Sequence, residues 1–455
     1  MQNPAKKLYL LSLGCPKNLV DSEVMLGYLE GQGYLVCDAP ERADLLVVNT
    51  CGFIQSAVEE AIDEILSLSL YKEEDPRKLL VVTGCLVQRY GQTLKDELPE
   101  VDLFIGTEGF HDIAARIGRL IEGKRDPELI LAPPVYLMES STPRRISTPV
   151  HRAYLKITEG CINRCSYCLI PALRGRLRSR TIADLLTEAN RLAAAGVQEL
   201  TLVAQDLTAY GLDLAENGKP NLLDLLKNLL THADIPWIRL LYMHPARVNM
   251  ALLQLMADNP RILPYFDIPL QHVSNRILKA MKRPYTKRQA LDLIANIRNL
   301  LPRQAIRTSF MVGFPGEKEK DVEELAEFMT NIRLDHVGIF TYSNEEGCAA
   351  AQLPEQCDEK IKEERRNLLM EIQAEISLRK NSALVGKREI VLVEGLSAET
   401  DLLLEGRTIF QAPDVDGRIY INEGQCAAGD FVWVEFTEAH TYDLVGRIVA
   451  GAEQD

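Results

Sequence analysis

The sequence predicts an α/β protein built from several domains: an open parallel sheet, a second series of strand–helix units, and a small closed all-β barrel. Three observations support this fold class. Through most of the chain, short apolar runs alternate with amphipathic stretches of helical period, which is typical of parallel sheets joined by helices. After residue 384 the helical period stops, and short strand-like runs are separated by turn signals such as Asp416-Gly417. The 455 residues suffice for about three domains of ~150 residues each.

The first third of the chain, residues 1–132, has the pattern of an open doubly wound sheet. Apolar runs that predict buried parallel strands lie at residues 8–13, 45–49, 79–83 and 102–105. Stretches with helical periodicity lie between or after them, at residues 20–30, 55–70 and 110–121. We therefore expect parallel strands with helices on both faces of the sheet.

Three cysteines of this region, Cys15, Cys51 and Cys85, each follow a predicted strand directly. Open α/β sheets bind ligands at this carboxyl edge, so the three cysteines should meet in space although they are far apart in sequence. Each has a glycine next to it, which would let the backbone approach a bulky metal cluster. The alternative is three structural cysteines in the core.

Residues 133–150 are rich in proline and small polar residues, and we place a linker there. The central region, residues 151–357, again alternates strands and helices. Its predicted strands are residues 153–158, 199–203, 238–242, 266–268, 305–312 and 337–340. Its predicted helices are residues 182–195, 222–231, 250–257, 274–281, 287–300 and 319–332.

The first strand of the central region leads into a loop with Cys161, Cys165 and Cys168. Three cysteines in eight residues can converge on one metal centre, and they are too close and odd in number for disulfides. A zinc site would need a fourth ligand, and the only nearby histidine, His151, lies ten residues upstream. Iron–sulfur electron carriers use four thiolates, so three would leave one iron open, as a catalyst requires. Zinc and a plain ferredoxin-like cluster are the alternatives.

This cysteine spacing, followed by Leu-Ile-Pro, resembles the signature of the radical S-adenosylmethionine (SAM) enzymes. The resemblance implies a 4Fe–4S cluster held by Cys161, Cys165 and Cys168, whose open iron chelates the amino and carboxylate groups of SAM. Reduction of that cluster would release a 5′-deoxyadenosyl radical. The resemblance also implies a partial (βα)6 TIM-like barrel, which six strands match, whereas a closed eight-fold barrel would need more repeats.

Residues 12–23, Ser-Leu-Gly-Cys-Pro-Lys-Asn-Leu-Val-Asp-Ser-Glu, resemble the opening of the methylthiotransferase family within these enzymes. The resemblance implies a second, auxiliary 4Fe–4S cluster held by Cys15, Cys51 and Cys85. The Pro-Lys pair after Cys15 resembles the branch that modifies ribosomal proteins, the RimO branch. The branch that modifies tRNA tends to have Gln and Met at these two positions.

Candidate SAM contacts follow two strands of the central region. Gln205 and Asp206 end one strand and could contact the SAM amino group or ribose, although a capping pair is the alternative. Gly313 and Gly316 lie in a Val-Gly-Phe-Pro-Gly-Glu segment that resembles the SAM-adenine loop of the family, and a plain turn is the alternative.

Several other residue types near these motifs receive weaker interpretations. His272 lies in a segment that resembles the family's barrel mouth, but a lone histidine is usually structural. Four arginines follow the cysteine loop, and one of them could hold a carboxylate. We expect most of the four to form a solvated face, and assign none: Arg174, Arg176, Arg178 and Arg180. The cysteines without partners at ligand spacing are interpreted as incidental thiols: Cys37, Cys348, Cys357 and Cys426.

Residues 358–383 predict a charged connecting helix, and residues 384–455 predict a closed barrel of the OB type. The predicted strands are residues 388–394, 402–409, 418–421, 431–437 and 444–450. This region resembles the TRAM domain, which often binds RNA. However, it has five cations and fourteen anions, and the whole chain carries a net charge of −14, which disfavours phosphate and favours a basic protein partner. An acidic surface is also a solubility device in many proteins.

Taken together, the resemblances imply a radical SAM enzyme that methylthiolates the β-carbon of an aspartate in small-subunit ribosomal protein twelve. SAM would serve both as methyl donor and as radical source, and the auxiliary cluster would supply sulfur. A radical is needed because no side-chain base has a pKa matched to such a proton. A reducing electron donor such as flavodoxin or ferredoxin would also be required.

Two other functions remain open at this point. A tRNA adenosine methylthiotransferase would have the same clusters but should bind tRNA tightly. A non-catalytic iron–sulfur protein, for electron transfer or ribosome assembly, would show no SAM-dependent chemistry. Ten cysteines without a visible targeting segment indicate a reducing compartment, and no run is long enough to span a membrane. We expect a cytoplasmic monomer.

Overall fold

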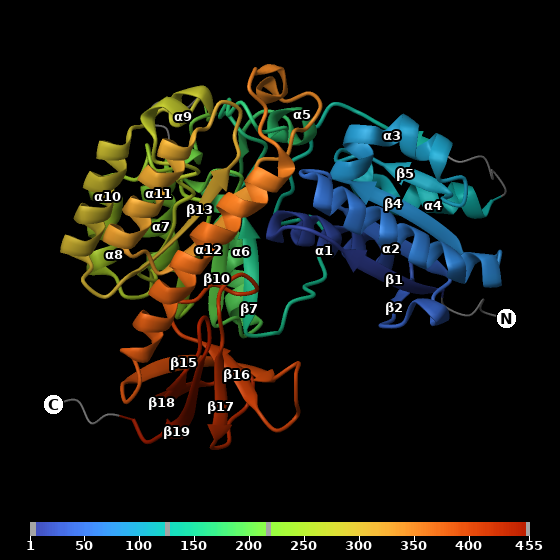
Figure 1. The fold of residues 1–455 in the computed structure, drawn as a ribbon. Coiled ribbons are helices and arrows are strands. Elements are labelled where there is room, and N and C mark those ends of the chain that lie inside the picture. Colours follow the sequence, from blue (N-terminus) through green and yellow to red (C-terminus); the bar gives the residue numbers. More distant parts are fainter. Residues whose placement is uncertain (1–5, 123–127, 215–219, 452–455) are drawn as a thin grey trace.

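The computed structural model describes residues 6–122, 128–214 and 220–451, and it divides into three parts (Figure 1). An α/β part is formed by the N-terminal third, a strand–helix barrel lies in the centre, and a small β-barrel lies at the C-terminal end. This arrangement confirms the predicted fold class. Within the described ranges, no helix has the length and apolar character needed to cross a membrane.

The N-terminal part contains a six-stranded parallel sheet in the order β2-β1-β3-β4-β5-β6. Alternate residues of β3 pack on opposite faces: Val47 packs against α1 and α4, and Val48 packs against α2 and α3. The sheet is therefore doubly wound, as predicted. Its strands are β1 (Lys7–Ser12), β2 (Leu35–Val36), β3 (Leu45–Thr50), β4 (Leu79–Gly84), β5 (Leu103–Ile105) and β6 (Glu128–Ile130). Its helices are α1 (Pro16–Glu30), α2 (Gln55–Glu74), α3 (Cys85–Glu97) and α4 (Ile113–Ile121).

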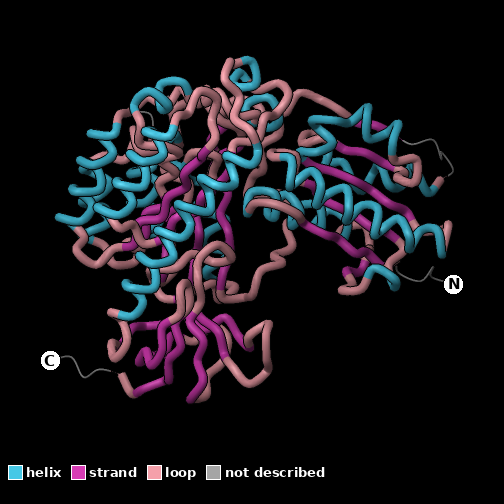
Figure 2. The backbone as a smooth tube through the Cα atoms, viewed as in Figure 1, coloured by secondary structure: helices cyan, strands magenta, loops and turns pink. Residues whose placement is uncertain are grey.

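Two helices of this part differ from the sequence prediction, and strands β2 and β6 were not predicted. Helix α1 begins at Pro16, earlier than expected, because proline suits the first helical turn. Helix α3 was not predicted at all: it begins directly at the end of β4, and no side chain caps its start. Residues 133–150, proposed as the linker, hold no helix or strand and run as a loop toward the central part (Figure 2).

The central part is an open barrel of six strands, each followed by at least one helix. The strands form two parallel three-stranded sheets, β11-β10-β7 and β12-β13-β14, which meet at a bridge between Ile238 and Ile262. The strands are β7 (Arg152–Lys156), β10 (Glu199–Val203), β11 (Trp237–Leu240), β12 (Tyr265–Asp267), β13 (Ala305–Val312) and β14 (His336–Thr341). The helices are α6 (Ile182–Ala194), α7 (Leu222–His232), α8 (Met250–Asp258), α9 (Asn275–Ala280), α10 (Lys287–Leu300) and α11 (Glu319–Ile332).

Both outer edges of this open barrel are covered by elements from elsewhere in the chain. Along β7, Tyr154 shares an apolar cluster with α1, and the linker residue Arg144 donates to the Tyr154 carbonyl at 2.8 Å. Along β14 runs α12 (Glu359–Ser382), which connects the barrel to the C-terminal part (Figure 1). Helix α12 buries Leu369 and Ile376 on its inner face. Neither edge is therefore open to another strand.

The C-terminal part is a closed five-stranded barrel in the order β15-β16-β17-β19-β18, as predicted. Apolar side chains such as Val391, Ile419 and Phe436 fill its interior. Only the β17–β19 pair is parallel, and the other neighbours are antiparallel. The strands are β15 (Arg388–Leu396), β16 (Leu404–Arg407), β17 (Ile419–Glu423), β18 (Phe431–Ala439) and β19 (Leu444–Val449).

The C-terminal barrel packs against the amino ends of the central strands. At the start of β10, Glu199 is fully buried and pairs with Arg239 at 2.5 Å and with Arg407 at 2.7 Å. At the start of β11, Trp237 contacts Phe431, with ring centroids 4.8 Å apart. The carboxyl ends of the same strands are left free of this barrel, and active sites in such barrels lie at the carboxyl ends.

This interface changes the interpretation of the acidic C-terminal charge. Glu389, Asp414 and Asp416 form ion pairs with arginines of the central part, which neutralise them. The excess of anions that faces solvent is therefore smaller than the composition indicates. Two further anions, Glu453 and Asp455, lie outside the described residues.

The stability of this interface should depend on acid pH through Glu394. Burial opposes ionisation of its carboxylate, but the hydrogen bond with His151 and the charges of Arg407 and Arg152 outweigh burial and lower its pKa to about 2. The group binds its proton more weakly in the folded state, so its contribution is complete above the unfolded pKa of roughly 4.3 and disappears as pH falls toward 2. We expect a loss of about 3 kcal/mol over this range.

Chemical denaturation between pH 6 and pH 2 would measure this loss, with Glu394→Gln as the matched control. The variant should be less stable at pH 6 and should lose less stability on acidification. Parallel pH profiles for the two proteins would contradict the prediction.

Candidate active site

The structure brings the turns that carry Cys15, Cys51 and Cys85 together at the carboxyl edge of the N-terminal sheet. A Cβ atom on Gly14 would lie 2.8 Å from the Cβ of Cys51, and Gly14 has a φ of +88°. A Cβ atom on Gly52 would lie 3.0 Å from the carbonyl carbon of Cys85. Both contacts are too short for any residue but glycine, so these glycines allow the three turns to pack against one another.

The three thiols of this set differ in their electrostatic surroundings. Burial and the neighbouring Cys85 raise the pKa of the Cys51 thiol to about 11, and burial also raises the pKa of Cys85. Burial opposes ionisation of Cys15 as well, but Lys17 and Arg174 outweigh it and lower its pKa. A metal centre at this site must therefore displace protons from at least two thiols.

Two buried cations lie against this cysteine set. Arg174 donates from Nε to the Cys85 Sγ at 3.2 Å. The Lys17 side chain is buried, with its Nζ 3.4 Å from the centroid of the Tyr242 ring, and within the described residues it forms no ion pair with a carboxylate. Buried cations are stable only near compensating negative charge. Arg174 finds this charge in Asp21, whereas Lys17 has no such partner among the described residues. A cluster held by three thiolates would supply negative charge beside Lys17, so these residues fit such a group.

The chemistry of the donor set also argues against a single metal ion. Among residues 6–122, 128–214 and 220–451, no three histidine, cysteine or acidic side chains lie close enough together to hold one ion. A structural zinc ion requires four ligands that converge on one point.

The second cysteine set lies in one loop between β8 (Thr158–Glu159) and the short helix α5 (Ile170–Arg174). The backbone N–H of Cys161 donates to the Gly175 carbonyl at 3.2 Å, and that of Ser166 donates to the Met281 carbonyl at 3.1 Å. The Asn163 N–H points at the Cys161 Sγ at 3.4 Å, and Arg283 lies 3.7 Å from the Cys165 Sγ. Donors directed at sulfur favour the thiolate form that binds iron.

Asp206, one of the predicted SAM contacts, is tied to this loop. Its carboxylate accepts from Asn163 Nδ2 at 2.7 Å and from Arg247 at 2.5 Å, and Arg247 also donates to the Asn163 Oδ1 at 2.9 Å. Asp206 therefore orients the cysteine loop and does not merely cap a turn. Gln205 is half-buried in the same turn.

The sequence analysis missed Arg247, Arg283 and His244. His244 and Arg247 come shortly after the end of β11, and this position at the carboxyl end of a strand is the signal that could have found them. Arg283 follows the short helix α9, where no such signal exists. His244 is buried, and its Nδ1 accepts from the Ala246 N–H at 3.2 Å. Burial, together with Arg283 and Arg247, lowers the pKa of His244 to about 3, so the imidazole is neutral and its Nε2 carries the proton.

Gly313 and Gly316 have positive φ angles of +72° and +78°. A Cβ atom on Gly313 would lie 2.2 Å from the Cγ of Lys362 in α12, so the close approach at this glycine is made by the connecting helix. A Cβ atom on Gly316 would come no closer than 3.6 Å to any neighbouring atom, which is an ordinary contact. The structure thus explains Gly313 by packing, and the SAM role of both glycines stays a prediction.

His272 is buried, and its Nδ1 accepts hydrogen bonds from the next two backbone N–H groups, as expected of a structural histidine.

The prediction that most of the four arginines form a solvated face was wrong. Only Arg176 is exposed, whereas Arg174 and Arg180 are buried because Asp21 and Glu188 offer them buried carboxylates.

Cys348, interpreted from the sequence as an incidental thiol, lies close to one of the predicted ligands. It lies in a buried apolar cluster with Cys85 and with two leucines of α5 and the turn before it. By contrast, Cys37 and Cys426 belong to the cores of the two outer parts.

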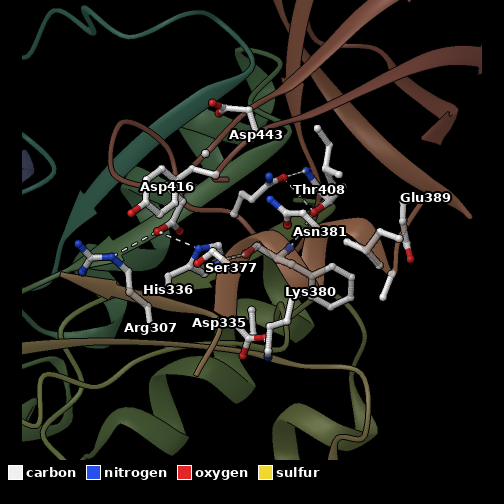
Figure 3. Close-up of a pocket in the computed structure, with 18 of the residues that line it drawn as sticks. Arg307, Asp335, His336, Ser377, Lys380, Asn381, Glu389, Thr408, Asp416 and Asp443 are labelled. Atoms are coloured by element: carbon white, nitrogen blue, oxygen red, sulfur yellow. Dashed lines mark hydrogen bonds and ion pairs between the residues drawn. The ribbon is translucent and has the colours of Figure 1, made fainter. Parts of the chain in front are cut away.

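A cleft of about 1220 Å³ lies at the opposite end of the central barrel, between β13, β14, α12 and the C-terminal barrel (Figure 3). None of the six predicted cysteine ligands lines it. Asp416 lies 3.4 Å from Arg307 and 3.6 Å from His336 in its wall, so these charges stabilise the junction between the two barrels. We place the active site at the cysteines, where the chemically reactive groups gather, and not in this cleft.

Comparison with protein families agrees with the three parts of the fold. Residues 7–106 match the model described as uncharacterized protein family UPF0004. Residues 155–329 match the radical SAM superfamily, and residues 385–449 match the TRAM domain. The two predicted cysteine sets fall within the first two matches.

Individual relatives are similar over nearly the whole chain. The ribosomal protein uS12 methylthiotransferase RimO of Desulfotalea psychrophila is 54% identical over 98% of this chain and 99% of its own length. The protein of the same name from Citrifermentans bemidjiense is 49% identical over 98% of both chains. Among solved structures, the radical SAM methyltransferase TsrM from Kitasatospora setae has a TM-score of 0.54, with 16% identity over 74% of this chain and 73% of its own, which supports the fold.

Proposed function

The chain belongs to the RimO family of ribosomal protein uS12 methylthiotransferases, and we propose that it attaches a methylthio group to the β-carbon of an aspartate in uS12. The chain is a radical SAM methylthiotransferase, and the aspartate of uS12 is the proposed target. The observation that carries the proposal is the buried packing of the segment after Cys168 against Cys85. Arg174, at the end of the helix that follows one set, donates to Cys85 of the other at 3.2 Å.

We assign one 4Fe–4S cluster to each cysteine set. Cys161, Cys165 and Cys168 would hold the cluster that binds SAM, and the N-terminal set would hold the auxiliary cluster: Cys15, Cys51 and Cys85. When bound, the clusters and SAM supply the electron, the 5′-deoxyadenosyl radical, the sulfur and the methyl group of the reaction. With three cysteines per set, each cluster keeps one position free for a ligand from outside the protein.

The protein's own residues hold and shield these groups. Asp206, Asn163 and Arg247 form a closed network that fixes the cysteine loop at the barrel mouth. Leu169 and Leu173 exclude water from the contact between the two sets, which limits the loss of reactive species to solvent. Lys17 and Arg174 offset the negative charge of the N-terminal set.

The proposed substrate and partners are based on the family of the chain and on the charge of its C-terminal part. The named relatives are uS12 methylthiotransferases. Four of the fourteen anions of the C-terminal part pair with arginines of the central part, and the remaining ten still outnumber its five cations, which suits a basic protein better than RNA. No observation favours a tRNA substrate or a non-catalytic role. We further propose a reducing electron donor such as flavodoxin or ferredoxin, and a cytoplasmic monomer.

Mass spectrometry of the products tests this function. The reconstituted protein would be incubated with SAM, a reductant, small ribosomal subunits and bulk tRNA, and both substrates would be digested. We expect the methylthio mass on one aspartate-containing peptide of uS12, and its absence when the reductant is omitted or when Cys168→Ala is used. Methylthio mass on tRNA alone would overturn the proposed substrate.

A further inference from the structure

We propose that Arg174 is a positioning residue that links the two cysteine sets into one unit and makes the N-terminal cluster easier to reduce. This inference rests on the proposed function, because it requires a cluster at the N-terminal cysteines. It concerns one residue of the arginine run that follows the cysteine loop.

Arg174 is the last residue of α5, six residues after Cys168. Its side chain is 3% exposed although arginine keeps its charge at any accessible pH. Burying such a charge costs several kcal/mol unless the surroundings provide hydrogen bonds and opposite charge. A buried arginine at this place therefore needs partners on every nitrogen.

Each nitrogen of the Arg174 guanidinium has a partner from the N-terminal part. One terminal nitrogen pairs with Asp21, and the other donates to the Asn18 Oδ1 at 2.9 Å. The remaining nitrogen, Nε, donates to the Cys85 Sγ at 3.2 Å. Asn18 and Asp21 lie on α1, the helix that follows Cys15, and Cys85 begins α3. One side chain thus holds the starts of the two helices that begin at cysteines.

The charges around the guanidinium balance without the thiol. Lys156 bonds to Asp21 and to Glu159, at 2.8 Å for Glu159, and Arg174 shares the same two carboxylates. Two cations therefore face two carboxylates. The bond from Nε to Cys85 is an additional, directed interaction with sulfur. Hydrogen bonds and positive charge at cluster sulfurs raise the reduction potential, because they stabilise the more negative reduced form.

The backbone continues this link into the second cysteine set. The residue after Arg174 is Gly175, whose carbonyl accepts from the Cys161 N–H at 3.2 Å. In addition, the hydroxyl of Thr107 in the N-terminal part donates to the Leu173 carbonyl at 2.6 Å. Cys85 and Cys161 are thereby joined through two consecutive residues, and a displacement of Arg174 must move one set relative to the other.

Redox titration of the full chain tests the inference. In a Cys161→Ala, Cys165→Ala, Cys168→Ala background only the N-terminal cluster remains, so its midpoint potential can be measured alone. We expect Arg174→Gln to shift that potential to more negative values, since a cation and a sulfur donor are lost. Arg174→Lys should give a smaller shift, because lysine keeps the charge but cannot bond to all three partners.

Arg176→Gln is the matched control, since Arg176 belongs to the same run but is exposed. It should leave the potential unchanged. With all six cysteines restored, Arg174→Gln should still form 5′-deoxyadenosine from SAM but should yield less methylthio product per deoxyadenosine, because the two sets are no longer held in register.

Two outcomes would overturn the inference, and they are distinguishable. If folded Arg174→Gln and Arg176→Gln have the same potential, Arg174 is a packing residue and the proposed function stands. If the background protein holds no iron, both the inference and the two-cluster function fail. Should Arg174→Gln not fold, Arg174→Lys decides in the same way, with Arg176→Lys as its control.

Discussion

Replacing Cys15, Cys51 and Cys85 together by alanine is expected to abolish methylthiolation while SAM cleavage to 5′-deoxyadenosine continues. The two activities separate because the three residues lie on turns of the N-terminal sheet, whereas the SAM cluster would be held by a loop of the central barrel. The loss of product should exceed about 100-fold, since even changes to groups around metal ligands cost 10–100-fold. Iron should fall from about eight to about four per chain.

Product formation, deoxyadenosine and iron would be measured on the same preparation. Cys37→Ala and Cys426→Ala are the controls, because these thiols pack in the cores of the outer parts and contact neither set. Full methylthiolation by the triple variant would contradict the assignment of the N-terminal ligands. An equal loss of SAM cleavage and methylthiolation would contradict the separation of roles.

Glu199→Gln is expected to cause the largest loss of stability from a single substitution away from the cysteines. Glu199 is fully buried between Arg239 and Arg407, and those arginines keep it ionised by lowering its pKa against the effect of burial. Removing the carboxylate leaves the buried Arg239 without its ion-pair partner, and leaves Arg407 with Glu394 alone. Breaking a buried ion pair in this way costs about 3–5 kcal/mol.

Chemical denaturation at pH 7 would measure this loss. Asp292→Asn is the matched control, since Asp292 forms an exposed ion pair with Arg288 at 3.0 Å, and such pairs contribute at most about 1 kcal/mol. A Glu199→Gln variant within about 1 kcal/mol of the parent would show that the arginines find other partners.

The elements that the sequence predicted best are those whose local signals agree with one another. Helix α10 has the predicted bounds, Lys287–Leu300, because its apolar residues recur on one face and Thr286 with Gln289 forms a capping box at its start. Helix α3 was missed because it begins directly at a strand end and, unlike α10, has no side-chain cap at its start. Local pattern is thus sufficient only where packing does not alter the backbone.

The meeting of the three N-terminal cysteine turns was predictable because the strand ends of a parallel sheet lie at one edge, and the structure brings these turns together there. The environment of Arg174 was not predictable in this way. Its partner Asp21 is 153 residues away in sequence, and nothing in the arginine run distinguishes a buried arginine from the exposed Arg176. Likewise, a glycine-rich turn does not reveal that its neighbour at Gly313 is Lys362. Contacts between distant elements decide these cases.

The covered edges of the open barrel restrict how this protein can be divided. Strand β7 is shielded by α1 and the linker, and β14 by α12, so an excised central fragment would expose two bare strand edges. Bare edges pair with strands of other molecules, and such a fragment should aggregate instead of staying monomeric. Dissection of the chain into independently expressed pieces therefore has to keep α1, the linker and α12 with the barrel.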